Sequence, residues 1–269
     1  MELKHILITG DTHGRTDERL GHIRHSMSQY SPTETAVIIL GDVGFNYYGG
    51  KKDLDAKKRA SSYGYTIYCV RGNHEERPSK VPGMKLVKDE FVGGTVWMED
   101  EFPLIRYFTD WGIYHIQDRK VLVVGGAYSV DKHYRLQNGW RWFENEQLTQ
   151  YEMDACMYSA DWSYFDLVLS HTCPASLMPV DKFLSFIDQT AVDKTMEIWL
   201  DRLMTRIKWN IHLWGHYHVD RIEAPHCEIF YNEVEDLKNI EARWEKFDQT
   251  GELDWWLPLS PAMKKITNK

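Results

Sequence analysis

Residues 5–14 of the chain read HILITGDTHG. The first half of this stretch is a short apolar run that predicts a buried strand, and the second half is a glycine-flanked turn. The turn carries Asp11 and His13, whose side chains would point the same way in an extended chain because they stand two residues apart. In α/β sheets ligands bind at the carboxyl ends of strands. The stretch therefore predicts binding or catalytic groups at such an end.

The same arrangement recurs four times along the chain. Apolar runs at residues 36–40, 65–70, 166–170 and 210–214 each predict a strand. These runs lead into GD at 41–42, RGNHE at 71–75, SH at 170–171 and GHYH at 215–218. Singly, such motifs are common and form strand-end turns or helix caps. Their conjunction in one order, always after an apolar strand, predicts that they converge on one site.

The rest of the chain alternates in the manner of an α/β protein. Apolar residues recur at helical spacing in residues 17–30, 51–62, 144–157 and 192–208. We expect two hairpins, one at residues 112–124 with its turn at 118–119 and one at residues 221–232. The segment 75–101 is rich in Gly, Pro and charged residues, which predicts a loop with short strands. We expect a main domain over residues 1–235 and a C-terminal accessory segment, 236–269, packing on the same domain.

Composition excludes several classes of protein. The 269 residues are 43% hydrophobic and 27% charged, which excludes wholesale disorder. A formal net charge of −8 gives no general attraction to nucleic acid or to anionic membranes. No apolar run approaches the roughly 20 residues of a membrane span, and the amino terminus begins a predicted strand rather than an apolar leader. The four cysteines lack Cys-x-x-Cys spacing, so we expect a cytoplasmic protein without a disulfide framework.

In their order and spacing the five motifs resemble the calcineurin-like metallophosphoesterase superfamily, over roughly residues 5–232. The resemblance implies an α/β fold, a four-layer α/β/β/α sandwich of two central mixed sheets flanked by helices, and a binuclear metal centre. It implies that one metal ion is held by Asp11, His13 and His218 and the other by Asn73, His171 and His216. Asp42 would bridge both ions. His74 would be the histidine that protonates the leaving group or steadies the phosphate instead of binding metal.

The chemistry of these side chains agrees with such roles. Carboxylate, imidazole and amide oxygen suit two divalent ions of Mn, Fe or Zn, and no thiolate is required. Two ions a few Å apart can share a water molecule, lower its pKa and clamp the phosphoryl oxygens. A bridging carboxylate partly neutralises the repulsion between two such cations. A leaving alkoxide needs a proton, and histidine is well suited to donate one near neutral pH.

Departures from the family pattern bear on the substrate. The protein Ser/Thr phosphatase branch follows Gly-Asp with a Val-Asp-Arg-Gly-like run whose arginine contacts phosphate, but residues 43–50 read VGFNYYGG. This argues against a dedicated protein phosphatase, although RGNHE at 71–75 is similar to that branch. Arg135 is the best candidate for a phosphate-binding cation, although we favour the alternative of an ordinary surface position. Asn46 and its loop are expected to line the substrate cleft or, equally, to be plain surface.

Two tryptophans in the unassigned stretch after residue 128 are also candidates. Trp140 and Trp142 would be able to stack on a nucleobase or an aryl group. We favour the alternative that both pack over a sheet.

The sequence thus predicts a metal-dependent phosphoesterase that hydrolyses phosphate esters with a hydroxide activated by two metal ions. A small-molecule phosphate ester is the expected partner, a phosphoprotein is possible, a membrane is not expected, and the net charge disfavours nucleic acid. The alternatives are a nuclease or cyclic-nucleotide phosphodiesterase and, from another class, a catalytically silent interaction scaffold of the same fold. The presence of His74 and of every expected ligand opposes the scaffold.

Overall fold

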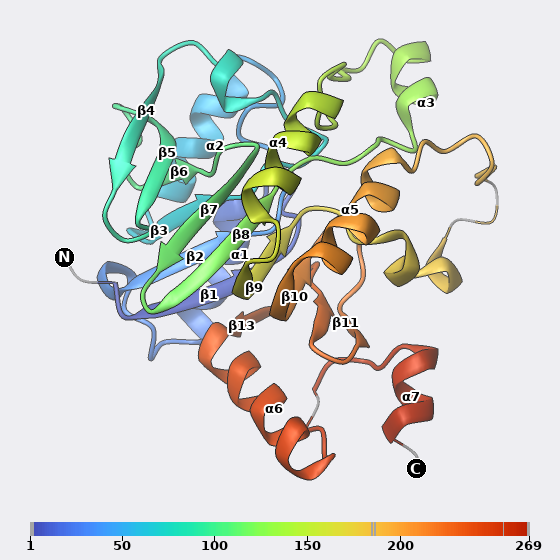
Figure 1. Ribbon diagram of the computed structural model, residues 1–269. Helices are drawn as coiled ribbons and strands as arrows, with labels where there is room; N and C mark the ends of the chain where they lie inside the picture. Colours follow the sequence, from blue (N-terminus) through green and yellow to red (C-terminus); the bar gives the residue numbers. More distant parts are fainter. Residues whose placement is uncertain (1–2, 184, 186, 255, 268–269) are drawn as a thin grey trace.

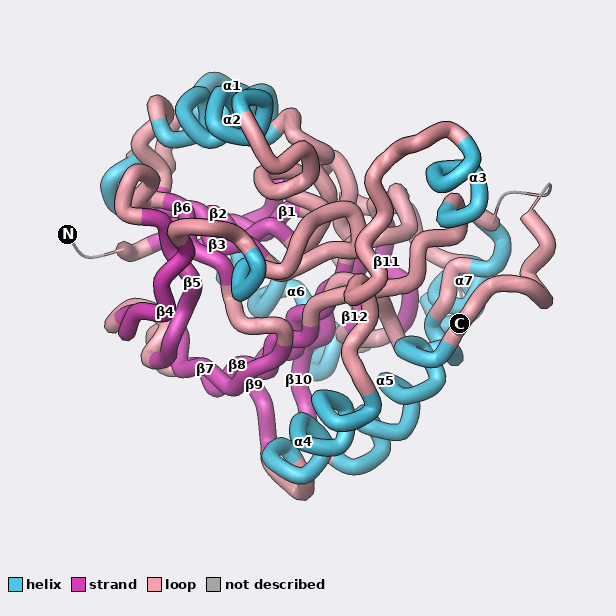
Figure 2. The backbone as a smooth tube through the Cα atoms, turned by 90° about the horizontal axis from the view of Figure 1, so that it is seen from above, coloured by secondary structure: helices cyan, strands magenta, loops and turns pink. Residues whose placement is uncertain are grey.

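Two β-sheets lie face to face at the centre of the molecule, and helices cover their outer surfaces (Figure 1, Figure 2). The computed structural model describes residues 3–183, 185, 187–254 and 256–267. The strand order is β13-β1-β2-β3-β6-β5-β4 in the first sheet and β11-β12-β10-β9-β8-β7 in the second. Figure 2 shows α1 and α2 outside the first sheet and α4 and α5 outside the second. The structure therefore has the four-layer α/β/β/α arrangement that the sequence predicts.

The elements have the following bounds. The strands of the first sheet are β1 His5–Thr9, β2 Thr35–Ile39, β3 Thr66–Cys69, β4 Met84–Asp89, β5 Gly94–Glu99, β6 Ile105–Tyr107 and β13 Val234–Asp236. Those of the second are β7 Trp111–Ile116, β8 Arg119–Val124, β9 Tyr164–Ser170, β10 Lys208–Trp214, β11 Arg221–Ala224 and β12 Cys227–Ile229. The helices are α1 Thr16–Ser26, α2 Lys51–Ser61, α3 Lys132–Gln137, α4 Gln150–Ala160, α5 Thr195–Arg206, α6 Leu237–Thr250 and α7 Pro261–Thr267.

Parallel pairing explains why the motifs meet. β1 pairs in parallel with β2, and β2 with β3. In the second sheet β8, β9 and β10 are likewise parallel. Parallel neighbours end at the same edge of a sheet, so the turns that follow them are brought together. Antiparallel strands at the sheet margins make both sheets mixed.

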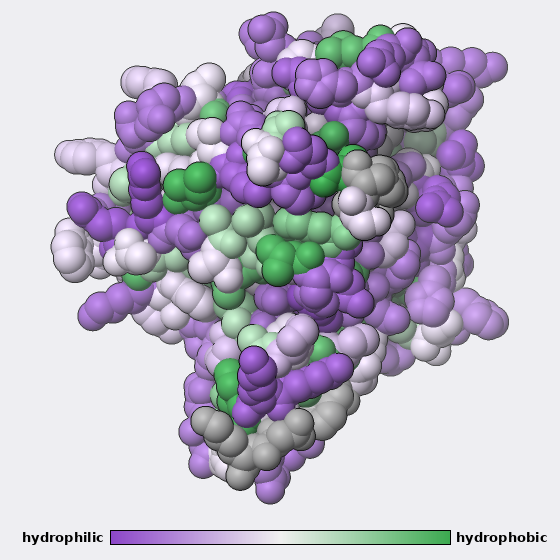
Figure 3. Space-filling model, turned by 90° about the vertical axis from the view of Figure 1, so that its right-hand side faces the viewer, coloured by the Kyte–Doolittle hydropathy of each residue, from purple (hydrophilic) through white to green (hydrophobic). Residues whose placement is uncertain are grey.

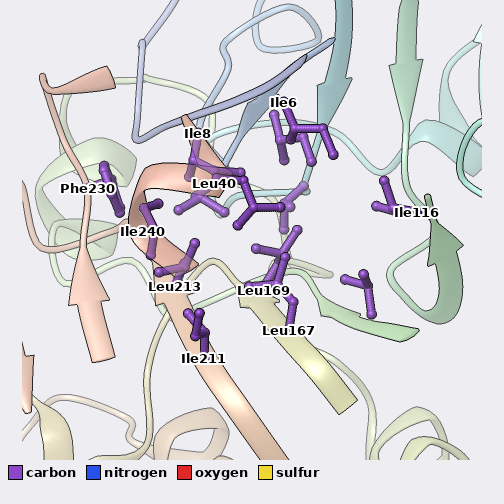
Figure 4. Packing of buried hydrophobic residues seen from close by; sticks show 14 of the residues in the cluster. Ile6, Ile8, Leu40, Ile116, Leu167, Leu169, Ile211, Leu213, Phe230 and Ile240 are labelled. Atoms are coloured by element: carbon purple, nitrogen blue, oxygen red, sulfur yellow. The ribbon is translucent and has the colours of Figure 1, made fainter. Parts of the chain in front are cut away.

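The main hydrophobic core fills the space between the two sheets (Figure 4). Ile6 and Ile8 of β1 point into this core, whereas Leu7 packs on the outer side with Leu20 and Ile23 of α1. A strand buried on both faces has no polar alternation, which is why β1 is a continuous apolar run. Among the described residues no helix is long and apolar enough to cross a membrane. Figure 3 shows a largely hydrophilic surface on the side of α3 and α7.

Three local expectations differ from the structure. Residues 75–101 are expected to be mainly loop, but they contain a regular hairpin in which β4 and β5 pair over six positions. Helix α4 begins at Gln150 and not at residue 144, because Thr149 and Glu152 form a capping box that starts the helix there. Helix α1 ends at Ser26, short of residue 30.

The C-terminal segment contributes to the central core. Leu237, Ile240 and Trp244 of α6 belong to the cluster between the sheets. Trp244 also donates through Nε1 to Glu228 Oε1 on β12, at 2.7 Å. The expected division of the chain after residue 235 lies inside β13 and stays a prediction.

Candidate metal centre

Side chains from the carboxyl ends of five strands converge on one site. They come from the turns after β1, β2, β3, β9 and β10. Among the described residues, three overlapping groups have ligand atoms within 4.8 Å of one another, and they consist of Asp11, His13 and His218; His13, Asp42 and His74; and Asp11, Asp42 and His171. Shared members make the three groups one continuous cluster, as a site for two neighbouring ions requires.

The backbone is strained at this cluster. His13, Asp42, His216 and His218 have φ values of 46°, 48°, 69° and 51°. These lie in the left-handed region, where residues other than glycine are uncommon. They are four of the seven such residues in the described part of the chain. Strain of this kind concentrates at functional sites, where the surrounding structure holds it in place.

Glycines allow the chains to approach closely at the same place. A Cβ atom on Gly72 would lie 1.9 Å from Asp42 Oδ1, and one on Gly41 would lie 2.0 Å from His171 Nδ1. Both distances are far shorter than any van der Waals contact. The glycines before Asp42 and Asn73 are therefore needed to bring the β2, β3 and β9 turns together.

At one side of the cluster three ligand atoms face a common point. Asp11 accepts a hydrogen bond from the His216 backbone N–H at Oδ1, 3.0 Å, while its Oδ2 is buried without a hydrogen-bond partner. His218 Nε2 and His13 Nε2 lie 3.4 and 3.9 Å from that oxygen and 2.9 Å from each other. An unpaired buried carboxylate oxygen costs free energy. A cation at this point would remove that cost, so the residues fit a metal ion.

At the other side two acceptor atoms face each other. His171 donates from Nδ1 to the Leu40 carbonyl at 2.8 Å, which leaves Nε2 as the ring nitrogen that can offer a lone pair to a metal ion. Nε2 lies 2.9 Å from Asn73 Oδ1, and Asn73 is held with its oxygen inward because its Nδ2 donates to Ser129. Ser129 in turn donates to Glu146. Two acceptors at this separation repel unless a cation or a proton lies between them, so this pair also fits a metal ion.

The two acidic ligands are stabilised as carboxylates. Asp42 lies between the two sides, with Oδ1 3.6 Å from His171 Nε2 and Oδ2 3.9 Å from His13 Nδ1. Burial would raise its pKa, but the charges of His74, His171 and His13 hold the pKa of Asp42 well below its usual range. Burial likewise opposes ionisation of Asp11, and its contact with His218 outweighs burial, so the pKa of Asp11 is also lowered.

His216 joins the cluster through ring packing. Its ring centroid lies 5.0 Å from that of His171. Burial, with a smaller contribution from His171, lowers the pKa of His216 to about 3. The ring is therefore neutral at physiological pH, which is the form that binds metal. The structure thus brings all seven expected ligands to one place.

Arg135 lies beside His74, and the alternative that it is an ordinary surface residue is wrong. The side chain is 7% exposed, and Nη2 lies 2.9 Å from Nε2 and 3.0 Å from Nδ1 of His74. Asp131 orients it by accepting from Arg135 Nε at 2.7 Å. The second carboxylate oxygen of Asp131, Oδ1, lies 3.8 Å from His74 Nε2 and has no hydrogen-bond partner.

A cavity of about 310 Å³ beside α1 reaches Asp11, and two further cavities open on the cluster at His74. The larger, about 600 Å³, is lined by Asp42, Asn73, His74 and His216 together with residues of the second sheet's loops. The other, about 470 Å³, is lined by His13, Tyr47, Tyr48, His74, Arg135, Trp140 and Arg141. Trp140 therefore stands on a cavity wall, 53% exposed, and the expectation that it packs over a sheet is wrong. Trp142 instead donates from Nε1 to the buried Glu146 at 2.8 Å.

Asn46 is not brought to either cavity. It is 4% exposed and absent from both linings, whereas the next two residues, Tyr47 and Tyr48, stand on the wall of the second. Its backbone carbonyl accepts from the Glu76 N–H at 3.1 Å. The structure therefore corrects the expectation for this loop: its tyrosines, and not Asn46, face the cavity.

Sequence reasoning missed supporting residues around the site. Asp131 and Ser129 lie in a stretch without apolar periodicity, so no local pattern singles them out. Glu75 closes the RGNHE motif, and its carboxylate accepts from the backbone N–H groups of Gly72 and Gly44 at 2.8 and 3.2 Å. Burial raises the pKa of Glu75 to about 7, and the charge of Asp42 adds to this effect. Its place inside the motif was the available signal.

Comparison with known proteins agrees with this geometry. The model of the calcineurin-like phosphoesterase family matches residues 4–220, and the chain belongs to this family. Membership supports a metal-dependent phosphoesterase in general, with a hydrolase acting on phosphate esters as its class. No curated protein matches the chain.

Many solved structures resemble the chain, and three of them illustrate the range of similarity. The crystal structure of TT1561 of Thermus thermophilus is 12% identical, with 87% of this chain and 98% of that chain covered and a TM-score of 0.45. The phosphopantetheinyl hydrolase PptH from Mycobacterium tuberculosis is 14% identical, with coverages of 92% and 93% and a TM-score of 0.42. The protein of unknown function AQ665 from Aquifex aeolicus is 14% identical, with coverages of 62% and 80% and a TM-score of 0.29.

Proposed function

We propose that the protein is a phosphatase-like hydrolase that cleaves small phosphate esters with two divalent metal ions. The observation that supports this most directly is the position of the partly buried His74 and the buried Arg135, immediately beside a cluster of side chains that could bind cations. His74 Nδ1 lies 3.5 Å from Asp42 Oδ2. A phosphate bound to the cluster would therefore lie within reach of both a guanidinium and an imidazole.

The ligands divide into two sets. Asp11, His13 and His218 would hold one ion, and Asn73, His171 and His216 the other, with Asp42 between them. The donor set of carboxylate, imidazole and amide suits Mn, Fe or Zn. When bound, the two ions would lower the pKa of a shared water molecule and offset the charge of the phosphoryl oxygens.

The chain's own residues would bind the ester and move the proton. Arg135 can donate two parallel hydrogen bonds to phosphate oxygens, and Asp131 keeps its guanidinium oriented. His74 would donate a proton to the leaving oxygen. Burial lowers the pKa of His74 in the free protein, partly opposed by Asp42, and an anionic substrate beside the ring would favour its protonated form.

The alternatives are separated by particular residues. A silent scaffold is disfavoured because the ligand set and His74 are complete. A phosphoprotein remains a second candidate substrate, because Arg135 supplies the guanidinium that residues 43–50 lack. We also propose a cytoplasmic location, which the four free, buried cysteines support.

Hydrolysis of 4-nitrophenyl phosphate tests the proposal. The purified protein is stripped with chelator and then assayed with Mn²⁺, Fe²⁺ or Zn²⁺ added separately. We expect activity only with metal, and loss of activity in the Asp42→Asn variant. An inactive wild-type protein whose metal content is verified, tested also on phosphorylated metabolites and phosphopeptides, would contradict the proposed function and favour the scaffold.

A further inference from the structure

The two cavities at His74 border different members of the metal cluster. His74 is the residue that appears in both linings. Asp42 and His216 line the first cavity, and His13 lines the second. At about 600 and 470 Å³, each falls within the range that holds an organic ligand. A phosphate at the cluster would therefore have room for an organic group on both sides.

The first cavity, away from the metal ligands, is largely apolar. Its walls include Val130, Met178, Val192 and Val219, together with the charged residues Asp131, Lys182, Asp193 and Lys194. Glu197 also lines it, with Oε1 accepting from Thr172 at 2.7 Å and Oε2 without a hydrogen-bond partner. Apolar walls of this kind favour a group that buries hydrocarbon surface.

The second cavity is aromatic and positively charged. Tyr47, Tyr48 and Trp140 line it together with Arg135 and Arg141, and no carboxylate lines it. Tyr48 and Trp140 are 54% and 53% exposed. Lys52 Nζ lies over the Tyr48 ring, 4.4 Å from its centroid, so the indole of Trp140 offers the more accessible ring. Arg141 is exposed and makes no ion pair with any residue that the structure describes. Indole, phenol and guanidinium groups all stack on planar rings.

From these contacts we infer that the substrate is a phosphodiester with two organic arms. One arm, with apolar surface, occupies the first cavity, and a planar aromatic arm, such as an aryl group or a nucleobase, occupies the second. A monoester has one arm and would leave one cavity without a ligand group. This inference rests on the proposed function and specifies its substrate class.

The reaction balances with water as the only co-reactant. A water oxygen forms a bond to phosphorus while the bond from phosphorus to one ester oxygen breaks. The leaving oxygen takes up one proton and departs as an alcohol or phenol. The second proton of the water is released, and the product is a phosphomonoester dianion that retains the other arm.

Kinetics with matched esters test the substrate class. With Mn²⁺ added, we expect kcat/KM for bis(4-nitrophenyl) phosphate to exceed kcat/KM for 4-nitrophenyl phosphate by about 10-fold or more. We expect kcat/KM for methyl 4-nitrophenyl phosphate to lie well below the value for the bis-aryl ester. A monoester hydrolysed as well as, or better than, both diesters would overturn the inference while leaving the proposed function intact.

Binding of inert analogues tests the two arms without any turnover. Diphenylphosphinate carries two aromatic arms and methyl(phenyl)phosphinate carries one, both through P–C bonds. We expect Trp140→Ala and Met178→Ser each to weaken binding of diphenylphosphinate by about 10-fold in calorimetric titration. Only one of the two variants should weaken binding of methyl(phenyl)phosphinate. The control is Trp256→Ala, because Trp256 is exposed and lies outside both linings. This variant should leave binding of both phosphinates unchanged.

The binding result separates the two proposals. If only one of the two variants weakens binding of diphenylphosphinate, the ligand occupies one cavity and the two-arm inference is wrong. If both variants weaken it but no phosphate ester is hydrolysed with metal present, the two-arm site stands and the proposed function is wrong.

Discussion

Nη2 of Arg135 lies 2.9 Å from Nε2 of His74, although the two residues are 61 positions apart in the sequence. Arg135 comes from the short helix α3 and His74 from the turn after β3. The contact joins the connection after β8 of the second sheet, which contains α3, to the carboxyl end of β3 in the first sheet. It places a fixed positive charge at the metal cluster, where a phosphate would need one.

Replacing Arg135 should therefore weaken turnover without emptying the metal sites. For Arg135→Ala we expect kcat/KM to fall by about 10²–10³, the range seen when one charge-stabilising donor is removed. Arg135→Lys should recover only part of this, because lysine cannot form the two parallel bonds. Arg202→Ala, on the exposed side of α5, is the matched control. Equal activity of Arg135→Ala and wild type would remove Arg135 from the site.

Asp42→Asn should lower the occupancy of both metal ions. A neutral amide cannot offset two dications, so we expect activity to fall by orders of magnitude. Metal analysis of the purified variant measures occupancy directly. Asp100→Asn, at an exposed surface ion pair, should keep its metal. Full occupancy of both sites in Asp42→Asn would mean that Asp42 is not the bridge.

His74→Asn should keep both metals and slow turnover by about 10²–10⁴, the range for loss of a general acid. The effect should shrink with nitrophenolate leaving groups, which depart without a proton. His74 also belongs to one potential metal group with His13 and Asp42, so metal analysis is the deciding control. Loss of metal would make His74 a ligand, and equal slowing for good and poor leaving groups would make its role phosphate binding.

Stability should depend on pH through Glu152. Burial tends to raise its pKa, but hydrogen bonds from Arg77 and Thr149 hold the pKa of Glu152 below its usual 4.5. The unfolded chain therefore binds this proton more readily. The contribution to stability is present above the unfolded pKa and is lost as pH falls through the lower folded pKa.

We expect Glu152→Gln to lower the free energy of unfolding by about 1–3 kcal/mol near pH 7 and by clearly less near about pH 3.5. Urea unfolding in the presence of chelator measures this without a contribution from metal loss. Glu144→Gln, at an exposed position, is the control. An effect of Glu152→Gln that is equal at both pH values would show that the carboxylate charge is not responsible.

The C-terminal segment should be required for stability. Trp244 is 1% exposed, and Trp244→Ala should cost about 3–5 kcal/mol, because it leaves a cavity and removes a donor from buried Glu228. Trp256, 45% exposed, is the control, and Trp256→Ala should change stability by less than about 0.5 kcal/mol. A small effect of Trp244→Ala would mean that the segment after residue 235 is dispensable to the core.

Much of the fold and all of the candidate metal ligands could be predicted from the sequence, partly from strand patterns and partly from the resemblance to the family. Apolar runs such as residues 36–40 identify buried strands because a strand covered on both faces needs apolar side chains throughout. The metal ligands follow those runs within a few residues, so local motifs locate them. Parallel pairing brings strand ends together within each sheet. Asp11 and His218 follow strands of different sheets, and their grouping came from the resemblance to the family pattern.

The surroundings of the candidate metal centre depend on tertiary contacts that the sequence pattern does not reveal. Arg135, Asp131 and Trp140 lie in a stretch with no apolar periodicity. Its pattern therefore does not indicate which side chains of this stretch face the site. Their positions depend on contacts with residues far away in the sequence, such as His74 and Tyr47. Side-chain periodicity reports whether a residue faces a core or solvent. It carries no information about which distant loop a polar side chain will meet, and that is what shapes the two cavities.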